Sequence, residues 1–221
     1  MVTDVIILAA DQGIKCWPYN EVKNKVMIPI ANRPIIDHNI SKLIELGVKN
    51  IHIVCGDFIN SIKNYYSCKN VECIESIDNN GTVDSLLSGL NKINNVCNFV
   101  VLYGDTIIHK SDLQQILESS VNTIMLSKLE EYCSNIIGCN ITNNEVTGIL
   151  AHPRDSVTHR LAAFHLDTSC IKYLENTADF MSNIQVGMMP IQERFIEATI
   201  ADMIDDSICF KQSKLNINLT I

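Results

Sequence analysis

The sequence predicts an α/β fold in which helices cover both faces of an open, mostly parallel sheet. The chain has 221 residues, of which 47% are hydrophobic and 19% are charged, a composition typical of a folded protein with a substantial core. Its first apolar run, Val5–Ala10, is uninterrupted, as expected of a strand that is buried on both faces. Further apolar runs alternate with segments of helical period, which is the pattern of successive βαβ units.

The first part of the chain carries these signals in regular order. After the first strand and a polar loop, Pro34 opens a helix and Gly47 ends it. Ser111 is expected to cap a later helix. The expected strands are Val5–Ala10, Ile51–Cys55, Val71–Glu75, Asn98–Tyr103 and Val121–Ser127. The expected helices follow Pro34, span Ile59–Tyr66, follow Gly81 and follow Ser111.

The remaining residues have a less regular pattern. Asn143 and Asn144 separate two short apolar runs, Ile136–Ile141 and Val146–Leu150, which predicts a hairpin. We also expect a strand at Arg160–Leu166, helices at Asp167–Asn176 and Gln192–Asp205, and a pair of short strands at the end. No internal repeat or linker divides the sequence. It therefore predicts a single domain over residues 1–221, in which residues 1–130 have the regular pattern and residues 131–221 the less regular one.

Charge and cysteine content narrow the class of protein. The formal net charge is -8 and the lysines are scattered singly, so no nucleic-acid partner is expected. No apolar run approaches the roughly 20 residues that span a bilayer, and no basic leader precedes the first strand, so we expect no membrane partner and a cytoplasmic protein. The nine cysteines include no CxxC, which favours free thiols over disulfides or a zinc site.

Three loops at strand ends carry residues suited to phosphate chemistry. Ligands of open α/β sheets bind outside the carboxyl ends of the strands. The loop Asp11–Lys25 contains a glycine and lysines, Asn79–Thr82 precedes a helix whose free N–H groups can accept an anion, and Gly104–Thr106 holds Asp105, a carboxylate suited to Mg²⁺. Each loop also has an ordinary explanation as a turn, a set of solvated lysines or a helix cap. Taken singly, none of them establishes a site.

Together, the loops match a known family in order and spacing. The segments "LAADQGIK", "NKVMIPIANRPIIDH", "GTVDSLL" and "LYGDT" resemble the successive motifs LAAGxGxR, PKxMxPIxxxPII, GT before a helix and GD after a strand. These are motifs of the sugar-phosphate nucleotidyltransferases, including the N-acetylglucosamine-1-phosphate uridylyltransferase and glucose-1-phosphate nucleotidyltransferase domains. The resemblance covers residues 5–120 well. It implies a three-layer α/β/α Rossmann-like nucleotidyltransferase fold with a mostly parallel central sheet.

The resemblance also implies an activity and a set of site residues. Members of the family join a nucleoside triphosphate to a sugar-1-phosphate and release pyrophosphate, with Mg²⁺ as cofactor; the best match implies UTP. Lys15 and Lys25 would be catalytic, and Asp105 with Asn218, or second to it Asn216, would bind the metal. The implied nucleotide-binding residues are Leu8, Ala9, Ala10, Asp11, Gly13, Ser76, Gly81 and Thr82. The implied sugar-binding residues are Tyr103, Gly104 and Gly138. The resemblance also implies that 1–130 is the nucleotide-binding half and 131–221 the sugar-binding half of the single domain 1–221.

Several departures from the family pattern leave two functions open. Asp11 replaces a loop glycine, Lys15 an arginine and Asn24 the proline before Lys25. A carboxylate about 4 Å from a phosphate charge costs roughly 1 kcal/mol in water and about 4 kcal/mol at an effective dielectric constant of 20. Asp11 therefore threatens the ligand unless it points to solvent or to Lys15. Further departures are Ser76 for a base-contacting glutamine, Ala151–Pro153 for an EKP motif and Leu161–Ala163 for an Asn-x-Gly segment.

The first function is an active nucleotidyltransferase, which the retained lysine, glycine, threonine and aspartate of the motifs favour. The second is a catalytically impaired homologue that acts as a regulatory or assembly subunit. A dehydrogenase is not expected, because no GxGxxG follows the first strand. The expected partners are a nucleoside triphosphate and a sugar-1-phosphate, and both a homo-oligomer and a longer parent protein stay open.

Overall fold

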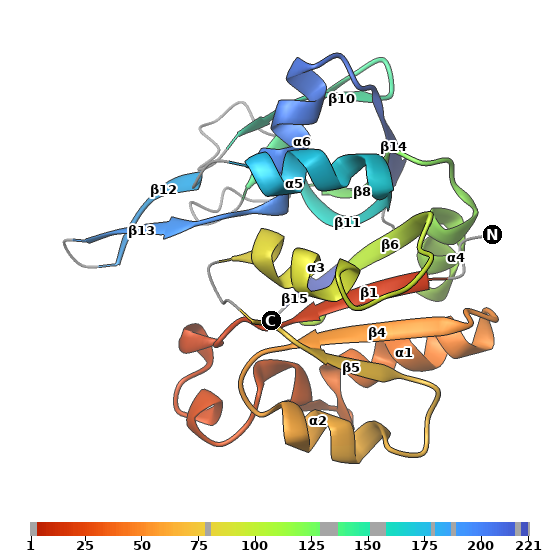
Figure 1. The fold of residues 1–221 in the computed structure, drawn as a ribbon, viewed down its shortest axis with the longest axis vertical. Coiled ribbons are helices and arrows are strands. Elements are labelled where there is room, and N and C mark those ends of the chain that lie inside the picture. The colour runs from red at the N-terminus through yellow and green to blue at the C-terminus, as the bar shows by residue number, and fades with distance from the viewer. Residues whose placement is uncertain are drawn as a thin grey trace.

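Helices cover both faces of a nine-stranded sheet whose strands follow the order β5-β4-β1-β6-β11-β8-β14-β10-β9 (Figure 1). The structure is a computed structural model that describes residues 4–77, 81–128, 137–150, 158–177, 180–186, 189–214 and 218–220. Strands β10 and β11 run against the others, so the sheet is mostly parallel, as predicted. The strands are β1 (Asp4–Ala9), β4 (Asn50–Cys55), β5 (Glu72–Glu75), β6 (Asn98–Tyr103), β8 (Thr123–Lys128), β9 (Gly138–Thr142), β10 (Glu145–Leu150), β11 (His159–Asp167) and β14 (Phe210–Lys214).

Strand β1 divides the interior into two apolar cores because its side chains alternate between the faces of the sheet. Val5, Ile7 and Ala9 pack into one core, and Ile6 and Leu8 pack into the other. The first core is covered by α1 (Ile35–Glu45), α2 (Ile59–Tyr66) and α4 (Lys110–Glu118). The second is covered by α3 (Thr82–Leu90), α5 (Ile171–Asn176) and α6 (Ile196–Asp205). The three-layer α/β/α fold is therefore confirmed.

The parallel pairing of β1 sets the position of the loops that carry the motifs. Its neighbours β4 and β6 run parallel to it, with Leu8 opposite both Val54 and Tyr103. The loops after β1 and β6 therefore leave the sheet at the same edge. Between β1 and α1, the short strands β2 (Pro29–Ile30) and β3 (Arg33–Pro34) form a hairpin. Its turn residues, Ala31 and Asn32, both have positive φ, as a tight two-residue hairpin requires.

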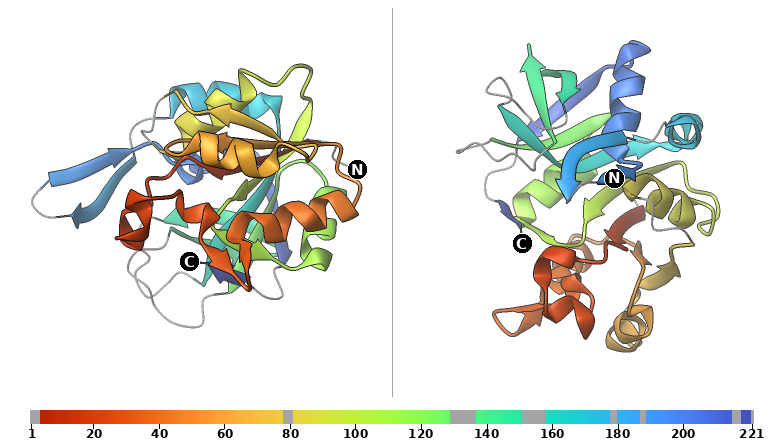
Figure 2. Two further views of the ribbon diagram at one scale, coloured as in Figure 1. Left: turned by 90° about the horizontal axis from the view of Figure 1, so that it is seen from below. Right: turned by 90° about the vertical axis from the view of Figure 1, so that its left-hand side faces the viewer.

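The structure differs from the prediction in four places. Strand β13 (Met189–Glu193) pairs with β12 (Phe180–Val186), so the helix expected at Gln192–Asp205 begins only at Ile196, after Phe195 in extended conformation. The resulting hairpin projects from the body of the molecule (Figure 2). The two short strands expected at the end are present, but they do not pair with each other: β14 inserts between β8 and β10, while β15 (Asn218–Thr220) pairs with β7 (Thr106–Ile108).

The third difference concerns the start of α4. His109, not Ser111, is the N-cap residue, because its Nδ1 accepts a hydrogen bond from the Ser111 N–H and the helix starts at Lys110, two residues earlier than a cap at Ser111 predicts. The fourth difference is the helix expected at Asp167–Asn176: Thr168–Cys170 forms a short 3-10 helix, and α5 begins only at Ile171. Other predicted elements lie within one or two residues of the observed ones, and Ile59–Tyr66 and Asn98–Tyr103 match them. The departures at Ala151–Pro153, the start of the expected hairpin at Ile136 and the alternative metal ligand Asn216 lie outside the described residues.

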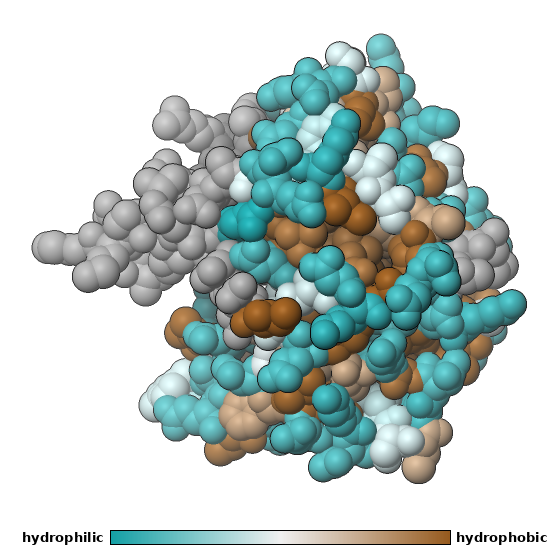
Figure 3. Space-filling model, viewed as in Figure 1, coloured by the Kyte–Doolittle hydropathy of each residue, from teal (hydrophilic) through white to brown (hydrophobic). Residues whose placement is uncertain are grey.

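The surface seen in Figure 3 is mainly hydrophilic, with hydrophobic residues gathered between α3 and α5. Leu87, Leu90 and Tyr173 of these helices are partly buried against the second core. Among the described residues, no helix is long and apolar enough to cross a membrane. The eight described cysteines are free thiols.

Candidate active site

A cavity of about 260 Å³ lies where β1 and β6 end and α3 begins. Residues from the three motif loops meet there, although they are separated in the sequence. The residues that line it are Leu8, Ala10, Asp11, Gln12, Ile14, Lys25, Gly81, Thr82, Ser85, Tyr103, Asp105 and Phe195. The predicted loops are thus brought together by the topology of the sheet.

Lys25 is the central charge of this cavity. Its Nζ donates a hydrogen bond to Asp105 Oδ2 at 2.7 Å and another to Asp11 Oδ2. The lysine side chain is only 14% exposed, so the ammonium group has lost most of its hydration. Burial would lower the pKa of Lys25, but the charges of Asp105 and Asp11 outweigh it and raise that pKa above its usual value. Lys25 therefore stays protonated.

Asp11 points toward Lys25 and not toward Lys15. Its Oδ1 also accepts a hydrogen bond of 2.8 Å from the Gly13 N–H. Burial acts to raise the pKa of Asp11, but the Lys25 ammonium group and this N–H lower it more, and the pKa lies below its ordinary value. Asp11 is not among the described residues with positive φ, so aspartate is accommodated here without backbone strain.

Asn24 holds the lysine loop against the sheet. Its Nδ2 donates to the Ala9 carbonyl at 2.9 Å and to the Asp57 carbonyl at 3.2 Å, and its Oδ1 accepts from the Val26 N–H. Asn24 is buried and caps the short helix Lys25–Met27. The asparagine that replaces the family's proline thus places Lys25 through hydrogen bonds, where proline would act by restricting φ.

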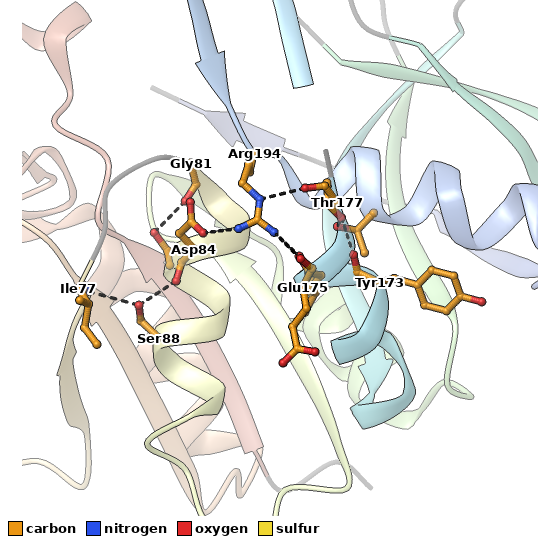
Figure 4. A network of polar contacts seen from close by, with 11 residues as sticks. Ile77, Gly81, Asp84, Ser88, Tyr173, Glu175, Thr177 and Arg194 are labelled. Atoms are coloured by element: carbon orange, nitrogen blue, oxygen red, sulfur yellow. Dashed lines mark hydrogen bonds and ion pairs between the residues drawn. The ribbon is translucent and has the colours of Figure 1, made fainter. Parts of the chain in front are cut away.

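The N-terminus of α3 is covered by the chain segment that enters α6 (Figure 4). The Arg194 carbonyl accepts from the Val83 N–H at 3.0 Å, and the Thr82 hydroxyl accepts from the Ile196 N–H at 3.0 Å. Gly81 has a φ of 119°, and a Cβ atom there would lie 2.3 Å from the Arg194 carbonyl oxygen. This segment also brings Phe195 to the wall of the cavity.

Tyr103 joins the cavity wall to a buried acid on α6. Its hydroxyl donates to Glu197 Oε1 at 2.5 Å. The other carboxyl oxygen, Oε2, is buried and has no hydrogen-bond partner in the described part of the chain. Burial raises the pKa of Glu197, although the Tyr103 hydroxyl opposes this, and burial also raises the pKa of Tyr103.

Other predicted residues support the cavity without lining it. Ala9 is buried and accepts the bond from Asn24, and Gly104 donates its N–H to the Leu8 carbonyl at 2.9 Å. Gly13 supplies the N–H that binds Asp11. Lys15 is exposed on the short helix Ile14–Cys16 and forms no ion pair with any described residue, although it is close enough to help lower the pKa of Asp11.

Two predicted residues are not among those that line the cavity, and a third, Asn218, is placed by its backbone register alone. Ser76 follows β5, donates its backbone N–H to the Cys55 carbonyl, and lines a separate surface cavity of about 540 Å³ with β5. Gly138 begins β9, opposite Leu150 and Arg160. Asn218 lies opposite Ile108, whereas Thr220 lies opposite Thr106, the residue after Asp105. The backbone register thus places Asn218 at the end of β15 that is farther from Asp105.

The residues missed by sequence reasoning come mainly from α6 and the segment before it. Phe195, Glu197 and Arg194 carry no motif. The one signal in the sequence is an aromatic residue, Phe195, directly before the apolar helical run that starts at Ile196.

The carboxylate of Asp105 fits an Mg²⁺ ion. It opens on the cavity, its side chain is 19% exposed, and Mg²⁺ needs one or two carboxylates when phosphate oxygens and water complete its shell. No group of three or more His, Cys, Asp or Glu residues within the described ranges could hold a metal by itself. A metal here would therefore depend on ligands brought by a phosphorylated substrate.

Comparison with known proteins places this site in a family. The chain matches the MobA-like NTP transferase domain over residues 5–174. It is 32% identical over 202 residues to the bifunctional protein GlmU of Methanococcus vannielii, covering 90% of this chain and 46% of that protein. It is 33% identical over 116 residues to the GlmU protein of Methanocaldococcus jannaschii, covering 52% of this chain and 28% of that protein. The chain thus spans less than half the length of these relatives.

Solved structures share the fold. A UDP-glucose pyrophosphorylase complexed with UDP-glucose has a TM-score of 0.81 at 18% identity, covering 98% of this chain and 92% of that one. The inositol-1-phosphate CTP transferase from T. maritima has a TM-score of 0.80 at 14% identity, covering 100% of this chain and 89% of that one. The domain match over residues 5–174 shows that the chain belongs to the MobA-like NTP transferase domain family, which confirms the predicted relation to the sugar-phosphate nucleotidyltransferases.

Proposed function

We propose that this protein joins a nucleoside triphosphate to a sugar-1-phosphate and releases pyrophosphate. The observation that carries the proposal is the position of Lys25. Its ammonium group lies in a cavity at the carboxyl edge of the sheet, in contact with Asp105 and next to the N-terminal turn of α3. Phosphoryl-type transfer depends on groups that neutralise phosphate charge. A permanently charged, largely buried ammonium group and a carboxylate that suits Mg²⁺ are such groups.

In the proposed reaction, an oxygen of the sugar phosphate attacks the α-phosphorus of the triphosphate. The new O–P bond forms as the bridge to the β-phosphorus breaks, and pyrophosphate leaves with the electron pair of that bridge. Lys25 would neutralise charge on the phosphate oxygens, and its raised pKa keeps the ammonium group charged throughout. The loop Ala10–Gly13 and the turn Gly81–Thr82 would hold the nucleotide. When bound, Mg²⁺ would neutralise further phosphate charge, with Asp105 as the protein ligand.

The substrates proposed are UTP and a hexose-type sugar-1-phosphate. A structural neighbour named a UDP-glucose pyrophosphorylase supports this pair of substrates. Another neighbour is named an inositol-1-phosphate CTP transferase, so both the base and the acceptor differ among proteins of this fold. Tyr103 and Gly104 are proposed to contact the sugar. Lys15 is proposed to contact the phosphates, since it stands on the same loop as Asp11 and is exposed.

One observation favours the second function, a catalytically impaired regulatory or assembly subunit. Asp11 accepts hydrogen bonds from Lys25 and from the Gly13 N–H, two donors that the nucleotide would otherwise use. A protein that cannot release this carboxylate would keep the fold without turnover. The assay for turnover distinguishes the two functions.

The test is a pyrophosphate-release assay with Mg²⁺, a panel of nucleoside triphosphates and a panel of sugar-1-phosphates. We expect turnover with at least one pair, and a loss of about 10² to 10³ in rate for Lys25→Met and for Asp105→Asn, the range typical of removing one charge-stabilising group. Lys23→Met is the matched control, because Lys23 lies on the same loop and forms no ion pair with a described residue. Absence of turnover with every pair, together with no nucleotide-dependent thermal shift, would refute the proposal.

A further inference from the structure

Two hydrogen-bond donors converge on the Asp11 carboxylate. The Gly13 N–H binds Oδ1 at 2.8 Å, and the Lys25 ammonium group binds Oδ2. A backbone N–H in a tight turn and an ammonium group are also the donors with which proteins bind phosphate oxygens. The carboxylate therefore occupies a position built for an anion.

The two donors are held in place without help from Asp11. Gly13 has a φ of 63° and packs so closely on the stem of Lys25 that an added Cβ atom would lie 3.0 Å from Lys25 Cβ. The Asn24 hydrogen bonds to Ala9 and Asp57 fix the start of the lysine turn. Removing the Asp11 charge should therefore leave the anion position intact.

The Asp11 side chain, by contrast, receives hydrogen bonds only from these two donors among the residues that the structure describes. It is 65% exposed at the mouth of the cavity, whereas the Lys25 and Asp105 side chains are mostly buried. Rotation of Asp11 into solvent would release the Gly13 N–H and one ammonium N–H, since Lys25 also binds Asp105. An incoming anion can thus accept the same two hydrogen bonds in place of the carboxylate.

The balance of charge determines which anion can do so. Asp11 and Asp105 together carry one more negative charge than Lys25 compensates, and Lys15 adds only a weaker attraction from the surface. We propose that Asp11 is a resident anion that excludes free triphosphate from this site and admits it only as a complex with a divalent cation. Such a complex brings positive charge for the two carboxylates at the moment when its phosphate takes the place of Asp11 on Gly13 and Lys25. This inference rests on the proposed function, because it assumes that a nucleotide enters the cavity.

The experiment measures UTP affinity by calorimetry, once with Mg²⁺ and once with EDTA. We expect the wild-type protein to bind UTP with Mg²⁺ and at least about tenfold more weakly with EDTA. We expect Asp11→Asn to gain about tenfold or more in affinity in EDTA, which reduces the dependence on the cation, because a nearby charge is removed while the shape of the side chain is kept. Fluorescence of the single tryptophan, Trp17, which lies exposed on the same loop, gives a second readout.

Asp205→Asn is the control, because it changes the net charge by the same amount at the exposed far end of α6. The inference is overturned if wild-type protein binds UTP equally with and without Mg²⁺, if Asp11→Asn does not bind better in EDTA, or if Asp205→Asn gives the same gain. A loss of affinity in Asp11→Asn under both conditions would also overturn it, because Asp11 would then be a ligand contact. In each of these cases the protein still binds nucleotide, so the proposed function stands. Failure of every variant to bind any nucleotide under either condition would instead contradict both the role of Asp11 and the proposed function.

Discussion

Arg194 Nη1 and Asp84 Oδ1 are 2.8 Å apart, although 110 residues separate them in the chain. The ion pair joins the segment that enters α6 to the first turn of α3, at the border of the cavity (Figure 4). The same guanidinium group donates to the carbonyls of Leu174, Glu175 and Thr177, which are the last carbonyls of α5 and its C-cap. One side chain thus holds three elements of the second core together.

We expect Arg194→Ala to lower the free energy of unfolding by about 2 to 4 kcal/mol. The substitution leaves the largely buried Asp84 carboxylate and the carbonyls at the C-terminal end of α5 without this donor. Arg194→Lys should recover only part of this, since an ammonium group cannot make the same fork of hydrogen bonds. Urea unfolding of both variants, of Asp84→Asn and of the Arg194→Ala/Asp84→Asn double variant measures the coupling of the pair. Strictly additive effects would show that the ion pair contributes nothing by itself.

Asn24 can be compared directly with the proline that the family pattern has at this position. Asn24→Ala should cost about 1 to 3 kcal/mol, because the buried carbonyls and the Val26 N–H lose their partner. Asn24 has a φ of -61°, which proline shares, so Asn24→Pro should be more stable than Asn24→Ala by about 0.4 to 1 kcal/mol. Chemical unfolding gives both values. If proline were the less stable of the two, the loop would not be held in the way described.

Gly81 is expected to be intolerant of a side chain. Gly81→Ala would bring a Cβ atom 2.3 Å from the Arg194 carbonyl oxygen, in addition to the cost of a positive φ. Gly47 is the matched control, since its φ is 80° and a Cβ atom there meets nothing within 4 Å. We expect Gly47→Ala to cost about 1 to 2 kcal/mol, from backbone strain alone, and Gly81→Ala to cost clearly more. Equal losses in urea unfolding would contradict the close approach.

Glu197 should make the protein less stable as the pH rises. Burial raises its folded-state pKa above the ordinary value of 4.5, so between these two pKa values the folded protein keeps a proton that the unfolded chain has lost. The contribution is fully present below pH 4.5 and is lost as the pH increases through the folded-state pKa.

Glu197→Gln should therefore flatten the pH dependence and stabilise the protein at neutral pH by about 1 to 3 kcal/mol, because a buried group no longer has to ionise. The glutamine can still accept the bond from Tyr103. Thermal unfolding measured from below pH 4.5 to neutral pH tests the effect, with Glu75→Gln, at an exposed residue, as control. A parallel pH profile in wild type and Glu197→Gln would show that Glu197 does not titrate in this way.

The sequence determined the elements whose signals are local. Ile59–Tyr66 and Asn98–Tyr103 were predicted with their observed bounds, because helical period and an uninterrupted apolar run depend only on neighbouring residues. The loops that hold Lys25, Asp105, Asp11, Gly81 and Thr82 were predicted to meet because the carboxyl ends of parallel strands share one edge, and the resemblance to the family singled out these residues within them.

Tertiary structure decided what depends on pairing between distant segments. The place of β14 between β8 and β10, the pairing of β15 with β7 and the β12–β13 hairpin are choices among strands that the apolar pattern does not distinguish. The same holds for the site. Asp11 faces Lys25 instead of Lys15, Phe195 lines the cavity, and Glu197 binds the Tyr103 hydroxyl. These contacts depend on how segments that are distant in the sequence pack together. Sequence spacing fixes which residues leave the sheet at one edge, but only the packed fold fixes which charges and rings then come into contact.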